Sequence, residues 1–247
     1  MTILNKRSVT PSFIQEAYWS EAWVRHIENY LSSPPRCGYW LKYKFPRITS
    51  ILEIAGGSCR DSLFLSRHYA NVIGSDFDEK TLFFLKSRYP EYKSVFSRQN
   101  AFQFEFNSKT FDLTFSNGFW VLFQNDKDIQ QLIREQARVT KKYLISLVHN
   151  GNNNRLIRTF NEKSKTDSLY NIRFFKPHEI MNNIKASGIQ YRSIRLEKFG
   201  GTVDRLLSTQ LTADSNCSHK TNLIIPRLYK YLPWSNVERI AVIVELT

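Results

Sequence analysis

The sequence has no long apolar run, and this absence excludes one large class of protein. No stretch of about 18 apolar residues occurs, so we expect no membrane-spanning helix. Residues 1–11 are polar and lack the apolar segment that a secretory signal requires. We therefore expect a cytoplasmic protein without a membrane span.

Cysteine is also scarce. The three cysteines, Cys37, Cys59 and Cys217, lie far apart and form no CxxC pair. An odd number at these spacings indicates neither a disulfide framework nor a zinc cluster. We therefore expect reduced thiols and predict no metal site.

Basic residues are abundant by comparison. The chain of 247 residues has 35 Lys and Arg against 22 Asp and Glu, a net charge of +13. Such a charge favours anionic partners, among them nucleic acid, phosphorylated sugars and membrane surfaces. Because no block of five or six basic residues occurs, a generally basic solvated surface is favoured over a dedicated nucleic-acid groove.

Hydrophobic patterning divides the chain into two parts. Residues 1–48 place aromatic and aliphatic residues at helical intervals, mainly over 13–31, and indicate an N-terminal helical lid. From 49 to 247, short apolar runs alternate with amphipathic segments, which predicts an α/β domain with an insertion at about 200–235. Strands are predicted at 48–55, 71–75, 94–98, 111–116, 143–148, 191–197 and 239–246, and helices from the first strand to about 69 and at 79–88, 127–139 and 177–186.

Two carboxylates at strand ends point to a nucleoside. The first strand contains Glu53 and runs into a turn of very small residues, 55–58, where a ligand can approach the backbone. The second strand ends at Asp76, where an acid of a doubly wound sheet can accept hydrogen bonds from both ribose hydroxyls. The turn lacks the GxGxxG spacing of dinucleotide-binding proteins, so another nucleoside-containing cofactor is predicted.

This turn resembles motif I of class I S-adenosylmethionine-dependent methyltransferases, E-x-G-x-G-x-G. Glu53 and Gly57 are kept, while Ala55 and Cys59 occupy the outer glycine positions. The resemblance extends over 48–198 and again at the last strand. It implies S-adenosylmethionine as the cofactor and a doubly wound, seven-stranded, mostly parallel sheet of the Rossmann-like methyltransferase type, preceded by N-terminal helices.

The resemblance also implies a set of cofactor-binding residues. Asp76 would bind the ribose, Phe77 and the segment 100–102 would surround the adenine, and the end of the fourth strand would lie beside the methionine moiety. Glu53 and Asp76 could instead cap the helices that follow, and Phe77, Phe102 and Phe119 could be core aromatic residues. The predicted cofactor-binding residues are Glu53, Ala55, Gly56, Gly57, Ser58, Asp76, Phe77, Asn100, Ala101, Phe102, Asn117 and Gly118.

Residues that contact the methyl acceptor are expected in the loops after the parallel strands and on the aromatic N-terminal helix. His149 is the best-placed titratable group for deprotonating a hydroxyl, and a hydrogen-bonded loop histidine is the alternative. The predicted acceptor-binding residues are Tyr18, Trp19, Phe119, Trp120 and Asn150.

Three functional hypotheses follow. The chain resembles methyltransferases of bacterial polysaccharide and small-metabolite pathways, which implies O-methylation of a small molecule or saccharide. The charge, with aromatic and basic residues at 39–44 and 229–231, also fits an RNA (tRNA) methyltransferase. A catalytically inactive cofactor-binding protein is the third, because Ala55, Cys59 and Asn100 depart from the family pattern.

Overall fold

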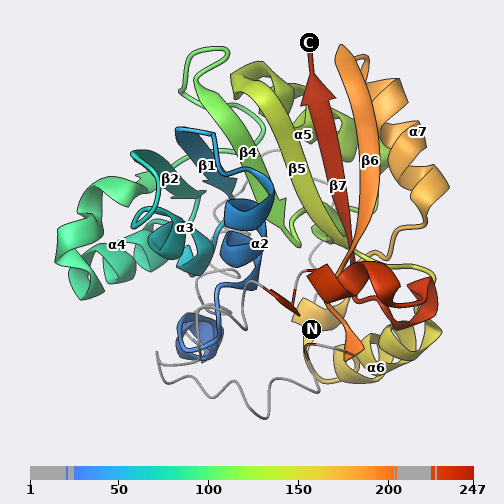
Figure 1. The fold of residues 1–247 in the computed structure, drawn as a ribbon. Helices are drawn as coiled ribbons and strands as arrows, with labels where there is room; N and C mark the ends of the chain where they lie inside the picture. The colour runs from blue at the N-terminus through green and yellow to red at the C-terminus, as the bar shows by residue number, and fades with distance from the viewer. Residues whose placement is uncertain (1–20, 22–24, 203, 205–223, 226) are drawn as a thin grey trace.

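A seven-stranded sheet forms the centre of the molecule (Figure 1). The structure is a computed structural model that describes residues 21, 25–202, 204, 224–225 and 227–247. The strand order is β3-β2-β1-β4-β5-β7-β6; the first five strands pair in parallel, and β7 runs antiparallel to both β5 and β6. The predicted fold class is confirmed. The strands are β1 (Ser50–Ile54), β2 (Asn71–Asp76), β3 (Phe96–Arg98), β4 (Phe111–Asn117), β5 (Thr140–His149), β6 (Tyr191–Phe199) and β7 (Arg239–Leu246).

Helices connect and cover these strands. Their ends follow local signals: the Asp78 side chain accepts a hydrogen bond from the Thr81 amide at the start of α4, and Gly188 ends α7 in the left-handed conformation. The sequence did not predict α6, which has no buried residue. The helices are α2 (Arg36–Lys44), α3 (Arg60–Leu65), α4 (Glu79–Arg88), α5 (Asp126–Val139), α6 (Asn154–Ser164) and α7 (Pro177–Ser187).

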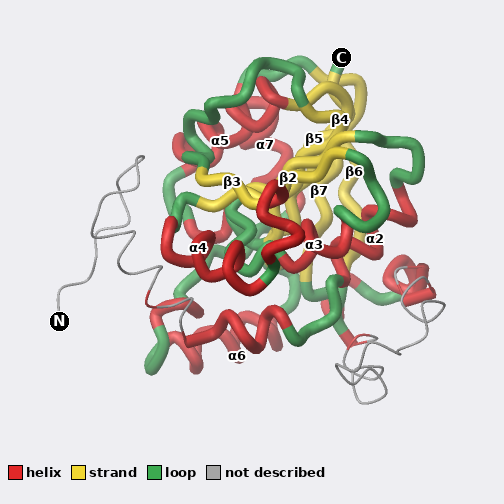
Figure 2. Tube along the Cα trace, turned by 90° about the vertical axis from the view of Figure 1, so that its left-hand side faces the viewer, coloured by secondary structure: helices red, strands yellow, loops and turns green. Residues whose placement is uncertain are grey.

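The sheet separates two hydrophobic layers because successive strand residues point to opposite faces. On β7, Ala241 and Ile243 pack in one core cluster with Trp40 and Leu41 of α2. Their neighbours on the opposite face of β7 pack in a second cluster with residues of α5 and α7. Figure 2 shows α5 and α7 on one side of the sheet and α2 on the other. Burial on both faces also takes in polar side chains, and Thr114 and Ser116 of β4 hydrogen-bond to Thr140 and Ser146 of β5.

Part of the expected N-terminal lid is built into this core. Helix α2 buries Cys37, Trp40 and Leu41 against the sheet. Residues 25–31 are also helical, and Ile27 packs with residues of α3 and α4. In the described part of the chain, no helix combines the length and the apolar character needed to cross a membrane.

The parallel strands end at the lower edge of the sheet in Figure 1, where α6 and the short helical turns Tyr229–Tyr231 and Trp234–Asn236 lie. Because β7 is antiparallel, its first residue, Arg239, lies at this same edge and pairs with His149 at the end of β5. Ligands of open α/β sheets bind at the carboxyl ends of the parallel strands, so this edge is the place to look for a site.

Candidate cofactor and acceptor site

The turn after β1 keeps a glycine-type conformation at two positions that lack glycine. Ala55, Gly57 and Cys59 all have positive φ, at 51°, 54° and 47°. A side chain in the left-handed region costs about 1–2 kcal/mol per residue. Every second residue of the turn therefore adopts the backbone shape expected of the glycine-rich motif, despite Ala55 and Cys59.

The Cys59 side chain fills the space behind this turn. The residue is fully buried, and burial raises the pKa of its thiol. A Cβ atom added to Gly56 would lie 2.8 Å from its Sγ, and one added to Gly74 would lie 2.9 Å from it. The two glycines are therefore needed where the sulfur approaches the backbone of β2 and of the turn.

Asp76, at the end of β2, is joined to the turn by hydrogen bonds. Its Oδ2 accepts from the Gly57 amide at 2.8 Å, and its Oδ1 accepts from the Asp78 amide at 3.0 Å. Burial raises the pKa of the carboxyl group, while these amides act in the opposite direction. Each oxygen keeps a further acceptor site, which fits the two hydroxyls of a ribose. The cap of α4 is Asp78, so helix capping is not the role of Asp76.

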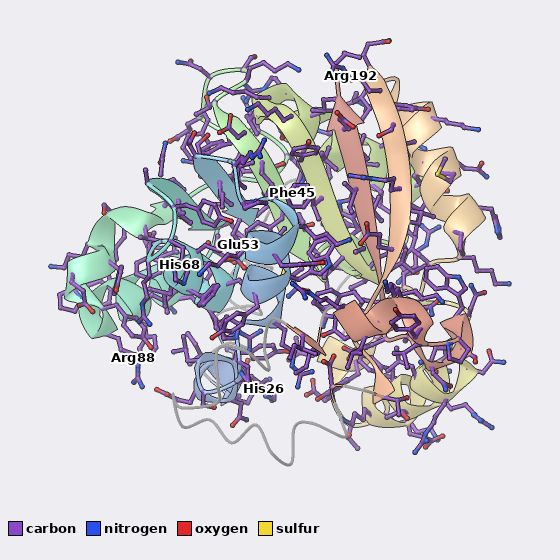
Figure 3. The ribbon with its side chains drawn as sticks, viewed as in Figure 1. His26, Phe45, Glu53, His68, Arg88 and Arg192 are labelled. Atoms are coloured by element: carbon purple, nitrogen blue, oxygen red, sulfur yellow. The ribbon has the colours of Figure 1, made fainter. Side chains whose placement is uncertain are left out.

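Glu53, labelled in Figure 3, lies on β1 and its carboxylate bonds to α3. Its Oε2 accepts from the Ser62 amide at 3.0 Å and from the Ser62 hydroxyl at 2.6 Å. Burial, together with the nearby Asp61 carboxylate, raises its pKa to about 8. These bonds to α3 correspond to the helix-capping role that was the alternative for Glu53. Glu53 therefore stabilises the turn after β1 through its contacts with α3.

The raised pKa of Glu53 predicts a loss of stability as the pH rises from acid to weakly alkaline values. A buried carboxyl whose folded pKa is about 8, against an ordinary value of 4.5, stabilises the fold below pH 4.5, and this contribution is lost progressively as the pH rises from 4.5 through about 8. The free energy of unfolding should fall by a few kcal/mol, at about 1.4 kcal/mol per pKa unit. Urea denaturation at pH 5.5 and pH 9 measures the change.

Glu53→Gln should flatten this pH dependence, because the amide oxygen can still accept from Ser62 and no charge is buried at high pH. The exposed Glu79 supplies a matched control, and Glu79→Gln should keep the wild-type slope. Equal slopes for wild type and Glu53→Gln would exclude Glu53 as the cause.

The segments after β3 and β4 contain both partly exposed residues and residues of the hydrophobic core. Asn100 Oδ1 accepts from the Phe102 amide at 3.0 Å, which leaves one acceptor site on this oxygen. Phe102 and Trp120 are buried in the cluster with α5 and α7, and Phe119 packs against the same cluster. Phe102 therefore fits the alternative role of a core aromatic residue. Trp120 is 1% exposed and packs in the core, whereas the sequence led us to expect a contact with the acceptor. Phe77 is half-buried beside Asp76.

A cavity of about 470 Å³ lies beyond the end of β4. Asn117 lines it, and the Asn117 Oδ1 accepts a hydrogen bond from the Arg239 guanidinium at the start of β7. The wall is strongly polar. Its lining residues are Ser32, Ser33, Pro34, Arg36, Cys37, Arg60, Asn117, Phe199, Asp204, Glu238 and Arg239.

A second cavity of about 430 Å³ shares Arg36, Asp204 and Glu238 with the first. Asp204 Oδ2 lies 3.0 Å from Arg36 Nη1, and Asp204 Oδ1 accepts from the Tyr229 hydroxyl at 2.8 Å. Burial raises the pKa of Asp204, although Arg36 opposes the shift. These charged groups form the boundary between the two cavities, and none of them was predicted from the sequence.

His149 and Asn150 lie at the predicted edge but line neither cavity. His149 is 6% exposed, its ring centroid is 5.0 Å from that of Phe160, and its Nδ1 has no hydrogen-bond partner among the described residues. Burial lowers its pKa well below 6.5, so the ring is neutral. The Asn150 amide donates to the carbonyls of Trp234 and Val237, at 2.7 and 3.0 Å. The structure thus gives Asn150 a role in holding the loop before β7, in place of the expected acceptor contact.

Some predicted residues lie outside the described part of the chain, namely Tyr18, Trp19 and Cys217. Within that part, Cys37 and Cys59 are free thiols, and no group of three or more His, Cys, Asp or Glu side chains is arranged to hold a metal ion.

A comparison with known protein families matches part of the chain to one family. Residues 51–143, which span β1 to the start of β5, match a family model described as a methyltransferase domain. The comparison with curated proteins gives no match.

Solved structures share the fold at low sequence identity. A Thermotoga maritima protein described as a S-adenosylmethionine-dependent methyltransferase, possible histamine N-methyltransferase, has 14% identity and a TM-score of 0.61, covering 93% of this chain and 99% of its own. An Archaeoglobus fulgidus S-adenosylmethionine-dependent methyltransferase has 15% identity and a TM-score of 0.57, covering 85% and 92%. Geranyl diphosphate C-methyltransferase from Streptomyces coelicolor, solved with Mg²⁺, geranyl diphosphate and S-adenosylhomocysteine, has 11% identity and a TM-score of 0.51, covering 81% and 73%.

Residues 51–143 thus match a methyltransferase domain, and the described chain has the fold of S-adenosylmethionine-dependent methyltransferases. Both findings support methyl transfer from S-adenosylmethionine. The similar structures carry names with different acceptors, an amine in one and a prenyl diphosphate in another. A fold of this kind therefore does not specify the acceptor, which must be argued from the cavity.

Proposed function

We propose that the chain methylates a hydroxyl group of a polar small molecule or saccharide held in the two cavities. The observation that supports this is the charged boundary between the cavities, formed by Arg36, Asp204 and Glu238. These residues line the same cavity as Asn117, at the end of β4. Closely spaced charged and hydrogen-bonding groups suit a hydroxylated acceptor, whereas an apolar acceptor would leave them desolvated.

The residues at the strand ends fit the cofactor. Asp76 binds the ribose hydroxyls, the backbone of 55–58 leaves room for close approach, and Asn117 and Gly118 border the methionine end. S-adenosylmethionine supplies a methyl group that its sulfonium already activates. The remaining task of the protein is to align the acceptor and to exclude water.

Glu238 is the group that we propose as the general base. Its side chain is 35% exposed and lines both cavities, and it is not part of the hydrophobic core. Because His149 is buried outside both linings, Glu238 replaces it as the group able to accept the hydroxyl proton.

We also propose that the described residues of 1–48 close one side of the first cavity. The Tyr30 carbonyl accepts from Arg60 Nη1 at 2.8 Å, and the Gly38 amide donates to Asp61 Oδ1 at 2.8 Å. Both bonds fasten this segment to α3, directly after the cofactor turn. The predicted cytoplasmic location is a further proposal, which cell fractionation checks.

Methyl transfer from radiolabelled S-adenosylmethionine to a panel of monosaccharides, sugar phosphates and small phenols tests the acceptor class. We expect label in an ether product of at least one compound. Cofactor binding without transfer to the panel or to RNA would favour the inactive cofactor-binding protein.

One observation favours RNA as the alternative acceptor. The Arg227 guanidinium lies 4.7 Å from the Tyr43 ring centroid, and Lys230 Nζ lies 4.8 Å from that of Tyr231. Trp40 and Tyr229 pack in one cluster, so the two aromatic and basic segments noted in the sequence are close, and the exposed rings of Tyr43 and Tyr231 can stack on bases. A gel shift with tRNA that persists at physiological salt, with label transferred to the RNA, would replace the small-molecule proposal.

A further inference from the structure

We propose that the Arg60 guanidinium binds the carboxylate at the methionine end of S-adenosylmethionine. This inference rests on the proposed placement of the cofactor across the strand ends. It assigns a cofactor contact to a residue that the turn motif does not include.

The direction of the cofactor follows from the strand order. Asp76 holds the sugar at the end of β2, and Asn100 lies after β3 on one side. If the adenine lies toward β3, the amino acid end must extend the other way, across β1 to β4. Neighbouring strands are about 4.8 Å apart, so the end of β4 is within reach of this chain. Arg60 and Asn117 line the cavity that begins there.

Arg60 has hydrogen-bonding capacity that the described residues do not use. Its Nη1 donates to the Tyr30 carbonyl, while its Nη2 lies 3.9 Å from Asp61 Oδ2, beyond a hydrogen bond. Its Nε is buried and has no hydrogen-bond partner among the described residues. Nε and Nη2 form one edge of the guanidinium, which matches the two oxygens of a carboxylate.

The other arginines of the cavity are already paired. Arg36 binds Asp204, and Arg239 donates to the Asn117 side chain and lies 3.4 Å from Glu238. A carboxylate at Arg60 would supply an acceptor to a buried cationic donor, which is costly to leave unpaired. Arg60 is therefore the arginine of this cavity that has a buried donor, Nε, from which no described residue accepts.

Two ligands separate this contact from the rest of the cofactor site. S-adenosylhomocysteine carries the amino acid group, and 5′-methylthioadenosine has the same nucleoside and thioether sulfur without it. By calorimetry, Arg60→Ala should lower the affinity for S-adenosylhomocysteine by about 10- to 100-fold and leave that for methylthioadenosine unchanged. Arg67, exposed and bound to the Tyr92 hydroxyl, supplies the control, and Arg67→Ala should bind both ligands as the wild type does.

Retained methylthioadenosine binding also shows that the variant is folded. If Arg60→Ala loses both ligands, Arg60→Gln is measured in the same way, and an equal loss of both ligands there overturns the proposal. Undiminished S-adenosylhomocysteine binding in Arg60→Ala, or a selective loss in Arg239→Ala alone, also overturns it. A wild-type protein that binds neither ligand would refute the cofactor site itself, which is a different outcome.

Discussion

Asp76→Asn should weaken S-adenosylhomocysteine binding by about 100-fold or more. A hydrogen bond to a charged group contributes about 1.5–3 kcal/mol, and the carboxylate is placed to accept one from each ribose hydroxyl. The asparagine has a single acceptor oxygen, and its NH₂ group would face either the Gly57 amide or the Asp78 amide, both of which donate. The substitution therefore removes a ribose contact and loosens the turn at the same time.

Calorimetry with S-adenosylhomocysteine measures this loss, and thermal unfolding of the same samples reports whether the variant is folded. Glu79, three residues further along, is exposed and paired with Arg98, so Glu79→Gln should bind as the wild type does. Wild-type affinity in Asp76→Asn would show that the ribose is held elsewhere.

The sheet could be predicted because its strands carry a local signal. The apolar residues of β1, β2 and β4 mark short strands, and all three were predicted within a few residues of their observed bounds. The start of β5 was missed because Thr140, Lys141 and Lys142 are polar or exposed there. Helix α6 was missed although Leu156, Ile157 and Phe160 share one face, because the rest of its sequence is polar and none of its residues is buried.

The cofactor half of the site is also local in sequence. The turn and Asp76 lie within one strand-helix-strand unit, so spacing alone placed them side by side. The structure adds that Ala55 and Cys59 keep the left-handed backbone, which spacing could not decide.

The acceptor half depends on contacts between distant segments. Arg36 begins α2, Asp204 lies in the 200–235 segment, and Glu238 precedes β7. One signal was present: a last strand that is antiparallel places its first residue at the carboxyl edge, so Glu238 and Arg239 could have been considered. The burial of His149 could not be predicted, because Phe160 beside it comes from the unpredicted α6.

Glu238→Gln should slow methyl transfer to a hydroxyl acceptor by about 100-fold or more, the usual range for a lost general base. The glutamine keeps the size and the hydrogen-bonding groups of the side chain but cannot take up the proton that the hydroxyl releases. Initial rates with the accepted member of the compound panel measure the loss. The affinity for S-adenosylhomocysteine should change far less than the rate, since Glu238 makes none of the proposed cofactor contacts.

Steady-state kinetics separate proton transfer from simple acceptor binding. Loss of a base lowers kcat and kcat/KM together, whereas loss of an acceptor contact raises KM. Glu197 lies on β6, pairs with Lys44 and lines neither cavity, so Glu197→Gln should keep the wild-type kcat and KM. A full wild-type rate in Glu238→Gln would mean that alignment alone drives transfer, as it can when the leaving group is already activated. A raised KM with kcat retained would instead make Glu238 an acceptor-binding group, and the proton would have to leave by another route.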